Sequence, residues 1–113
     1  MTSLSPDSLQ VWMAEGRPVV LLDTRSRDAY DVSHLPGAVP AESRTVSELR
    51  AVLPLDPQTP VVVYDEDGIP DPEQHDVAFE AADIYGFAHV HRLEGGLAAW
   101  RTRGFNLDGT AAR

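Results

Sequence analysis

The chain of 113 residues lacks cysteine and lysine altogether, and it has no apolar run long enough to cross a membrane. The missing cysteine excludes disulfides, thiolate metal sites and any thiol nucleophile. All nine basic residues are arginines, and 18 acidic residues give a net charge of −9 at pH 7. Nucleic acid and anionic membranes both require a basic surface, so neither is expected as a partner. A secretory signal pattern is also missing, which predicts a cytoplasmic protein.

The acidic residues are unevenly distributed. No lysine or arginine occurs from Ala51 to His91, whereas nine carboxylates do. These carboxylates are Asp56, Asp65, Glu66, Asp67, Asp71, Glu73, Asp76, Glu80 and Asp83. This part of the chain is therefore expected to form an acidic surface, and that surface is the main functional clue in the sequence.

Apolar runs alternate with helical spacing along the chain, which predicts an α/β fold. Strands are expected at 19–22, within 35–40, at 61–64 and at 89–93. Helices are expected between Ser5 and Gly16 and over 27–32, 45–53, 75–85 and 95–104. The alternation indicates a small, mainly parallel central sheet with helices on both faces.

Four stretches resemble motifs of the rhodanese family, in the family's order. They are 22–25 (Leu-Asp-Thr-Arg), 33–38 (Ser-His-Leu-Pro-Gly-Ala), 61–64 (Val-Val-Val-Tyr) and 93–100 (Leu-Glu-Gly-Gly-Leu-Ala-Ala-Trp). The resemblance implies a single rhodanese-like domain over 1–113, with a core at about 5–104 and a C-terminal tail at 105–113. The end of this tail, 108–113, is expected to be loose. We expect structural roles for the motif residues Asp23, Arg25, His34, Gly37, Gly95, Gly96 and Trp100.

In active members of this family, the residue after the strand that matches 61–64 is a cysteine that carries a persulfide. Here that residue is Asp65, which cannot hold a transferable sulfur. Six acidic residues and no arginine lie between Asp65 and Asp76, so we expect the segment to repel anions such as thiosulfate. Aspartate at this position also resembles the non-catalytic domains of tandem family members.

Other chemistry at the same segment is less well supported by the sequence. Asp65-Glu66-Asp67-Gly68 resembles the motif of aspartyl-phosphate phosphatases, but these need a lysine that the chain lacks. The acidic residues offer oxygen ligands, with His75 as a nitrogen ligand, yet their spacing fits no calcium loop. His89 and His91 alternate on a predicted strand without a third ligand. We therefore predict neither a metal site nor a cofactor.

The hypothesis that follows is a catalytically inactive module that binds a protein with a basic surface. Its recognition residues are predicted to be Asp65, Glu66, Asp67, Gly68, Asp71, Glu73, His75 and Asp76. Two alternatives stay open: a carboxylate- or metal-dependent hydrolase at Asp65 and Asp67, and a degenerate sulfurtransferase that works only with a partner chain. The sequence carries no indication of oligomeric state.

Overall fold

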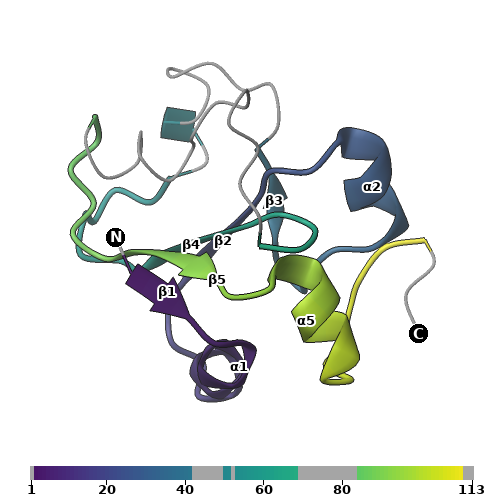
Figure 1. Cartoon of the computed structure of the whole chain (residues 1–113). Helices are drawn as coiled ribbons and strands as arrows, with labels where there is room; N and C mark the ends of the chain where they lie inside the picture. Colours follow the sequence, from purple (N-terminus) through teal and green to yellow (C-terminus); the bar gives the residue numbers. More distant parts are fainter. Residues whose placement is uncertain (1, 42–49, 52, 69–83, 111–113) are drawn as a thin grey trace.

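The computed structural model describes residues 2–41, 50–51, 53–68 and 84–110 (Figure 1). Its elements, in chain order, are β1 (Thr2–Leu4), α1 (Pro6–Ala14), β2 (Val20–Asp23), α2 (Arg27–Val32), β3 (Val39–Pro40), β4 (Val61–Tyr64), β5 (Val90–Leu93) and α5 (Gly96–Thr102). The expected strands and three of the expected helices are present, with ends shifted by a few residues at most. The helices expected at 45–53 and 75–85 lie largely outside the described residues.

The strands form one sheet in the order β1-β5-β4-β2-β3, and all neighbouring strands run parallel. The predicted α/β architecture with a parallel sheet is thus confirmed. The edge strand β1 was not predicted, because three residues are too short to show a period of two. Its pairing with β5, Leu4 opposite Leu93, supplies the order that its own sequence does not signal. All four residues of the central strand β4 are buried.

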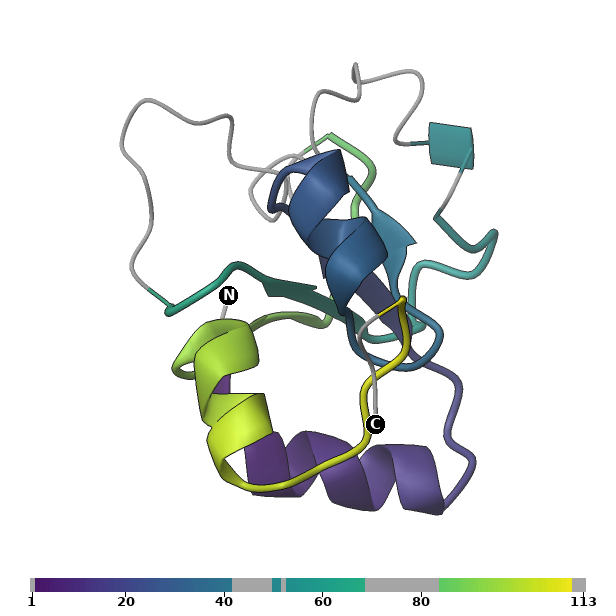
Figure 2. The ribbon, with the colours of Figure 1, turned by 90° about the vertical axis from the view of Figure 1, so that its right-hand side faces the viewer.

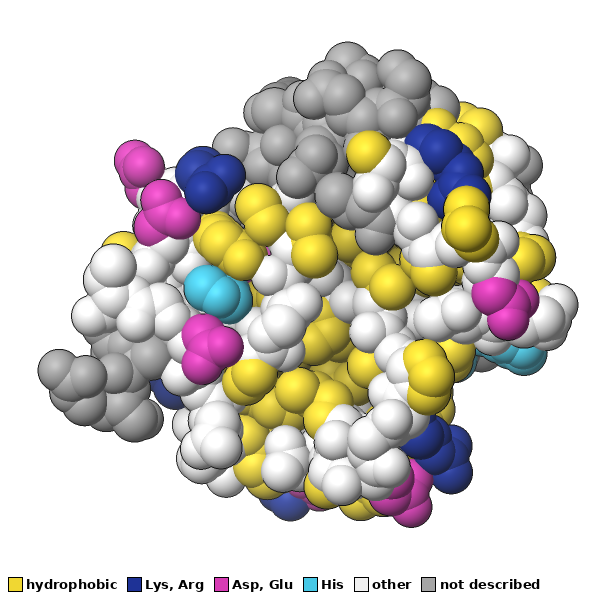
Figure 3. All heavy atoms as spheres, turned by 180° about the vertical axis from the view of Figure 1, so that it is seen from behind, with side chains coloured by type: hydrophobic (Ala, Val, Ile, Leu, Met, Phe, Trp, Pro, Cys, Tyr) yellow, Lys and Arg dark blue, Asp and Glu magenta, His cyan; other side chains and the backbone are white. Residues whose placement is uncertain are grey.

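Each face of the sheet carries its own apolar cluster. On one face, Leu9 of α1 and Leu97 and Trp100 of α5 pack against strand residues, and α1 and α5 lie together on that side (Figure 1). The other cluster includes Val61, Val63, Leu53, Phe87 and Val90, with Leu22 and Ala41. Seen from behind, hydrophobic side chains gather in the middle of the molecule and charged side chains lie mostly toward its edges (Figure 3).

Helix α1 begins where the sequence predicts. Ser5 is the N-cap, and its Oγ accepts a hydrogen bond from the Ser8 N–H at 3.1 Å. Pro6 occupies the first helical turn, where a missing N–H costs nothing. Leu9 is fully buried, so the helix is fixed against the sheet by its apolar stripe.

Asp108 and Thr110 are held by hydrogen bonds, which corrects the expectation that the chain is loose from Asp108 onward. We call residues 105–110 the C-terminal strap. The backbones of His34 and Asp108 exchange two hydrogen bonds of 2.9 Å, and the Thr110 N–H donates to the Asp31 carbonyl at 3.0 Å. The Trp100 Nε1–H donates to the Asn106 carbonyl at 2.8 Å. Figure 2 shows the strap, in yellow, running from the end of α5 toward α2. Asp31 and His34 lie far from the strap in the sequence, so no local pattern signals their contacts with it.

Candidate functional site

The carboxyl ends of β2, β4 and β5 meet at one edge of the sheet, and a small pocket opens there. It is lined by Thr24, Val63, Tyr64, Asp65, Gly68, Arg92 and Leu93. Open parallel sheets usually bind their ligands at this edge. Asp65 is the first residue after β4, as the sequence predicts, and it lines this pocket.

Residues 65–68, which we call the β4 loop, are held by the first turn of α5. The Leu97 N–H donates to the Asp65 carbonyl at 2.9 Å, and the Ala98 N–H donates to the Glu66 carbonyl at 2.8 Å. Within the loop, the Gly68 N–H donates to Asp65 Oδ1 at 2.6 Å. These three N–H groups are therefore already satisfied by the protein's own oxygens, and none of them is left to bind an external anion.

The glycine pair at the start of α5 makes this close approach possible. Gly96 has a φ of +59°, and a Cβ atom there would lie 2.5 Å from the Asp65 carbonyl oxygen. A Cβ atom on Gly68 would lie 2.8 Å from the Gly95 nitrogen. The backbones of the β4 loop and α5 thus touch directly, which gives the Gly-Gly motif a structural role.

Arg25 contacts residues of three separate segments next to the β4 loop. Its guanidinium forms a buried ion pair with Asp23, with Nη2 2.8 Å from Oδ2 and Nε 3.1 Å from Oδ1. Arg25 Nη2 also donates to the Ser33 carbonyl, and Nη1 lies 3.1 Å from Glu66 Oε1. Burial alone would lower the pKa of Arg25, but the hydrogen bonds and charge of Asp23, aided by Glu66, outweigh it and raise that pKa. The guanidinium is therefore permanently charged.

Arg101 of α5 approaches the same glutamate from the solvent side. Its Nη1 lies 3.7 Å from Glu66 Oε2, and its Nη2 donates to Ser33 Oγ at 3.3 Å. Glu66 is thus flanked by two arginines, and Arg92 lines the neighbouring pocket. The segment itself holds no arginine, as the sequence shows, but arginines from other parts of the chain lie beside it. Because these arginines lie outside the base-free interval of the sequence, local composition gave no sign of them.

Tyr64 and His34, which also belong to the family motifs, make structural contacts near the site. Tyr64 is buried and its oxygen accepts a hydrogen bond from the Leu35 N–H at 3.1 Å. Burial raises the pKa of the Tyr64 phenol, and the Asp23 carboxylate raises it further, so the phenol stays neutral. His34 Nδ1 is 2.8 Å from the Tyr30 carbonyl oxygen, and the two rings stack with centroids 3.9 Å apart. His34 therefore lies in a packed turn rather than in the pocket.

The other candidate ligands are not gathered into a site in the part of the chain that the structure describes. His91 lies edge-on to Trp12, with ring centroids 5.5 Å apart, and burial together with His89 lowers its pKa. Among the described residues, no three histidine or carboxylate side chains are placed to hold a metal ion. The predicted recognition residues Asp71, Glu73, His75 and Asp76 lie outside the described residues.

Comparison with known proteins agrees with the geometry. A model of the rhodanese-like domain matches residues 5–103. The chain is 31% identical over 101 residues to the probable adenylyltransferase/sulfurtransferase MoeZ of Mycobacterium tuberculosis, and the match covers 88% of this chain but only 24% of MoeZ. It is 29% identical over 103 residues to the thiosulfate sulfurtransferase GlpE of Pseudomonas entomophila, a match that covers 88% of this chain and 84% of GlpE.

Solved structures show the same fold. The BH2092 protein of Bacillus halodurans superposes with a TM-score of 0.77 at 20% identity, over 98% of this chain and 79% of that one. A rhodanese-like domain from Anabaena superposes with a TM-score of 0.71 at 29% identity, over 96% of this chain and 80% of that domain. No described helix is long and apolar enough to span a membrane. The chain belongs to the rhodanese-like domain family, and it carries no cysteine at any position.

Proposed function

We propose that the chain is a catalytically inactive rhodanese-like module that binds a protein with a basic surface through its β4 loop. The observation that carries the proposal is Asp65, a carboxylate at the position where the resemblance places the sulfur-carrying cysteine. A carboxylate there cannot take up and release sulfur, but it can attract a guanidinium or an ammonium group.

The stiffness of the loop supports a binding role. Two hydrogen bonds from α5 and one within the loop fix the backbone from Asp65 to Gly68. A loop that is ordered before it binds loses little conformational entropy when a partner arrives. Glu66 and Asp67 are exposed and Asp65 is half-buried, so all three lie within reach of another molecule.

The three carboxylates do not contribute equally. Glu66 is partly neutralised by Arg25 and Arg101, whereas the side-chain contact of Asp65 is with a neutral backbone N–H. The attraction for a basic partner is therefore expected to come more from Asp65 than from Glu66. The hydrolase alternative is not favoured, because no further carboxylate or histidine joins Asp65 and Asp67 among the described residues.

Binding of a dye-labelled oligoarginine peptide, followed by fluorescence anisotropy, tests the proposal. The unmodified chain should bind at low ionic strength, and affinity should fall by about fivefold or more at physiological ionic strength because charges at a surface are screened. The triple variant Asp65→Asn, Glu66→Gln, Asp67→Asn should bind at least about fivefold more weakly than the unmodified chain.

A matched control separates local recognition from net charge. Glu15→Gln, Asp28→Asn and Asp56→Asn together remove the same charge at exposed positions directly after α1, on α2 and in the segment before β4. This control should retain most of the affinity. Equal weakening of the two triple variants would show that the peptide senses only the overall charge, and the proposal would fail.

A further inference from the structure

We propose that Arg101 is an intramolecular competitor for Glu66. In this proposal, which rests on the proposed function, Arg101 occupies the outer oxygen of the Glu66 carboxylate and so limits how tightly the β4 loop binds a basic partner. Displacing Arg101 would then be part of partner binding.

The two oxygens of Glu66 meet different environments. Oε1 is 3.1 Å from Nη1 of Arg25, whose side chain is only 7% exposed. Oε2 is 3.7 Å from Nη1 of Arg101, whose side chain is 52% exposed. Oε1 is thus committed to a buried cation, while Oε2 faces a cation that solvent or another molecule can replace.

The contact between Arg101 and Glu66 is weak enough for a basic partner to displace Arg101. Arg101 is nevertheless held close enough to Glu66 to compete with that partner. At 3.7 Å the guanidinium nitrogen lies beyond ordinary hydrogen-bond distance from Oε2, and exposed ion pairs of this kind contribute little free energy. Ser33 Oγ, however, accepts a hydrogen bond of 3.3 Å from Arg101 Nη2 and keeps the guanidinium beside Glu66. A tethered cation has a high effective concentration at the carboxylate.

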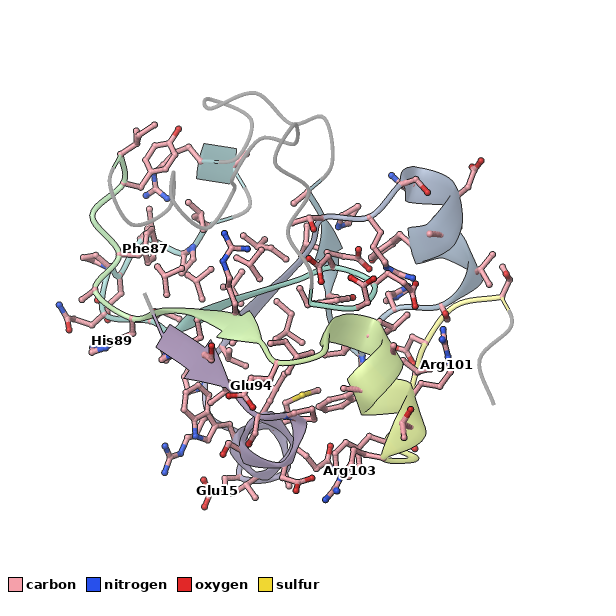
Figure 4. The ribbon with its side chains drawn as sticks, viewed as in Figure 1. Glu15, Phe87, His89, Glu94, Arg101 and Arg103 are labelled. Carbon is pink, nitrogen blue, oxygen red and sulfur yellow. The ribbon has the colours of Figure 1, made fainter. Side chains whose placement is uncertain are left out.

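Arg103 offers a control from the same region. It directly follows α5, its side chain is 54% exposed, and it pairs with Asp7 Oδ2 at 2.5 Å. Figure 4 shows the two arginines at different places, with Arg101 on the side of α5 toward α2 and Arg103 beside α1. Removing either arginine changes net charge by the same amount, but only Arg101 touches Glu66.

The test measures oligoarginine binding at low ionic strength for Arg101→Gln, Arg103→Gln, Glu66→Gln and the double variant Arg101→Gln, Glu66→Gln. Arg101→Gln should tighten binding by about two- to fivefold, the range expected when a weak exposed ion pair is removed. Arg103→Gln should change it by less than about 1.5-fold. In the Glu66→Gln background, Arg101→Gln should have no further effect, because the contact it breaks is already gone.

Ser33→Ala provides a second route that leaves both charges in place. It removes the hydroxyl that holds Arg101, and it should tighten peptide binding, as Arg101→Gln does. Thermal melting checks that each variant is folded. Equal tightening by Arg101→Gln and Arg103→Gln, or an Arg101→Gln effect that persists without Glu66, would overturn the competitor role while leaving the proposed function intact. Failure of the unmodified chain and all variants to bind would reject both.

Discussion

The role that the sequence indicates for Glu66 differs from the role that the structure shows. In the sequence it is one of three successive acidic residues and looks like part of a recognition surface. In the structure its carboxylate bridges Arg25 and Arg101, and so it connects β2, the β4 loop and α5. A residue with such contacts supports the loop as well as contributing charge.

Glu66→Gln should therefore lower the free energy of unfolding by about 1 kcal/mol, because the buried Arg25 loses a charged partner while its pair with Asp23 remains. Urea unfolding measures the change. Glu94→Gln, at an exposed position after β5, is the comparison and should alter stability by less than about 0.5 kcal/mol. Equal effects would mean that the Glu66 bridge contributes nothing beyond its charge.

Some residue-level features were predictable and others were not. Local patterns indicate the positions of Ser5, Asp65 and Gly96. These patterns are a helix cap, the end of a buried strand and the start of a helix, respectively. Arg101 has no such signal, since its partner Glu66 lies 35 residues earlier and only the fold brings them together. An ion pair between distant segments cannot be deduced from spacing along the chain.

Among the contacts between structural elements, the site depends on the one between the β4 loop and α5. Gly96→Ala should destabilise the protein by about 3 kcal/mol, because a methyl group would meet the Asp65 carbonyl in addition to the strain of a positive φ. Gly37→Ala isolates the strain alone: φ there is +79°, and nothing lies within 4 Å of its Cβ position. It should cost about 1–2 kcal/mol. Thermal unfolding measures both variants, and equal losses of stability would argue against the close contact at Gly96.

The C-terminal strap is the second element whose role is measurable. A chain that ends at Leu107 loses the two His34–Asp108 hydrogen bonds and the contact of Thr110 with Asp31. Unfolding free energy should fall by about 2 kcal/mol, since each exposed backbone hydrogen bond contributes somewhat less than 1 kcal/mol. A chain that ends at Thr110 keeps these contacts and serves as the reference for the comparison. A truncation without effect would restore the idea of a loose tail.

At the scale of the whole molecule, the sequence predicted the architecture well because burial in a parallel sheet leaves a strong signal. The apolar runs that became β2 and β4 are packed against an apolar cluster on each face of the sheet, and such strands need no alternation to be recognised. The edge strand β1, the strap and the arginines around Glu66 escaped prediction, because each depends on pairing between segments far apart in the chain.

This edge of the sheet presents carboxylates, and within the described residues the N–H groups and arginines that could hold a sulfur anion already have partners in the protein. The loop's hydrogen bonds with α5 are internal, Arg25 and Arg101 are engaged by Glu66, and Arg92 is not free either. The most direct measurement is thiocyanate formation from thiosulfate and cyanide by Asp65→Cys, with Asp65→Ser as the control. We expect no turnover above that control, whereas cyanide-dependent turnover by Asp65→Cys would show that donors for a sulfur anion remain available at this edge of the sheet.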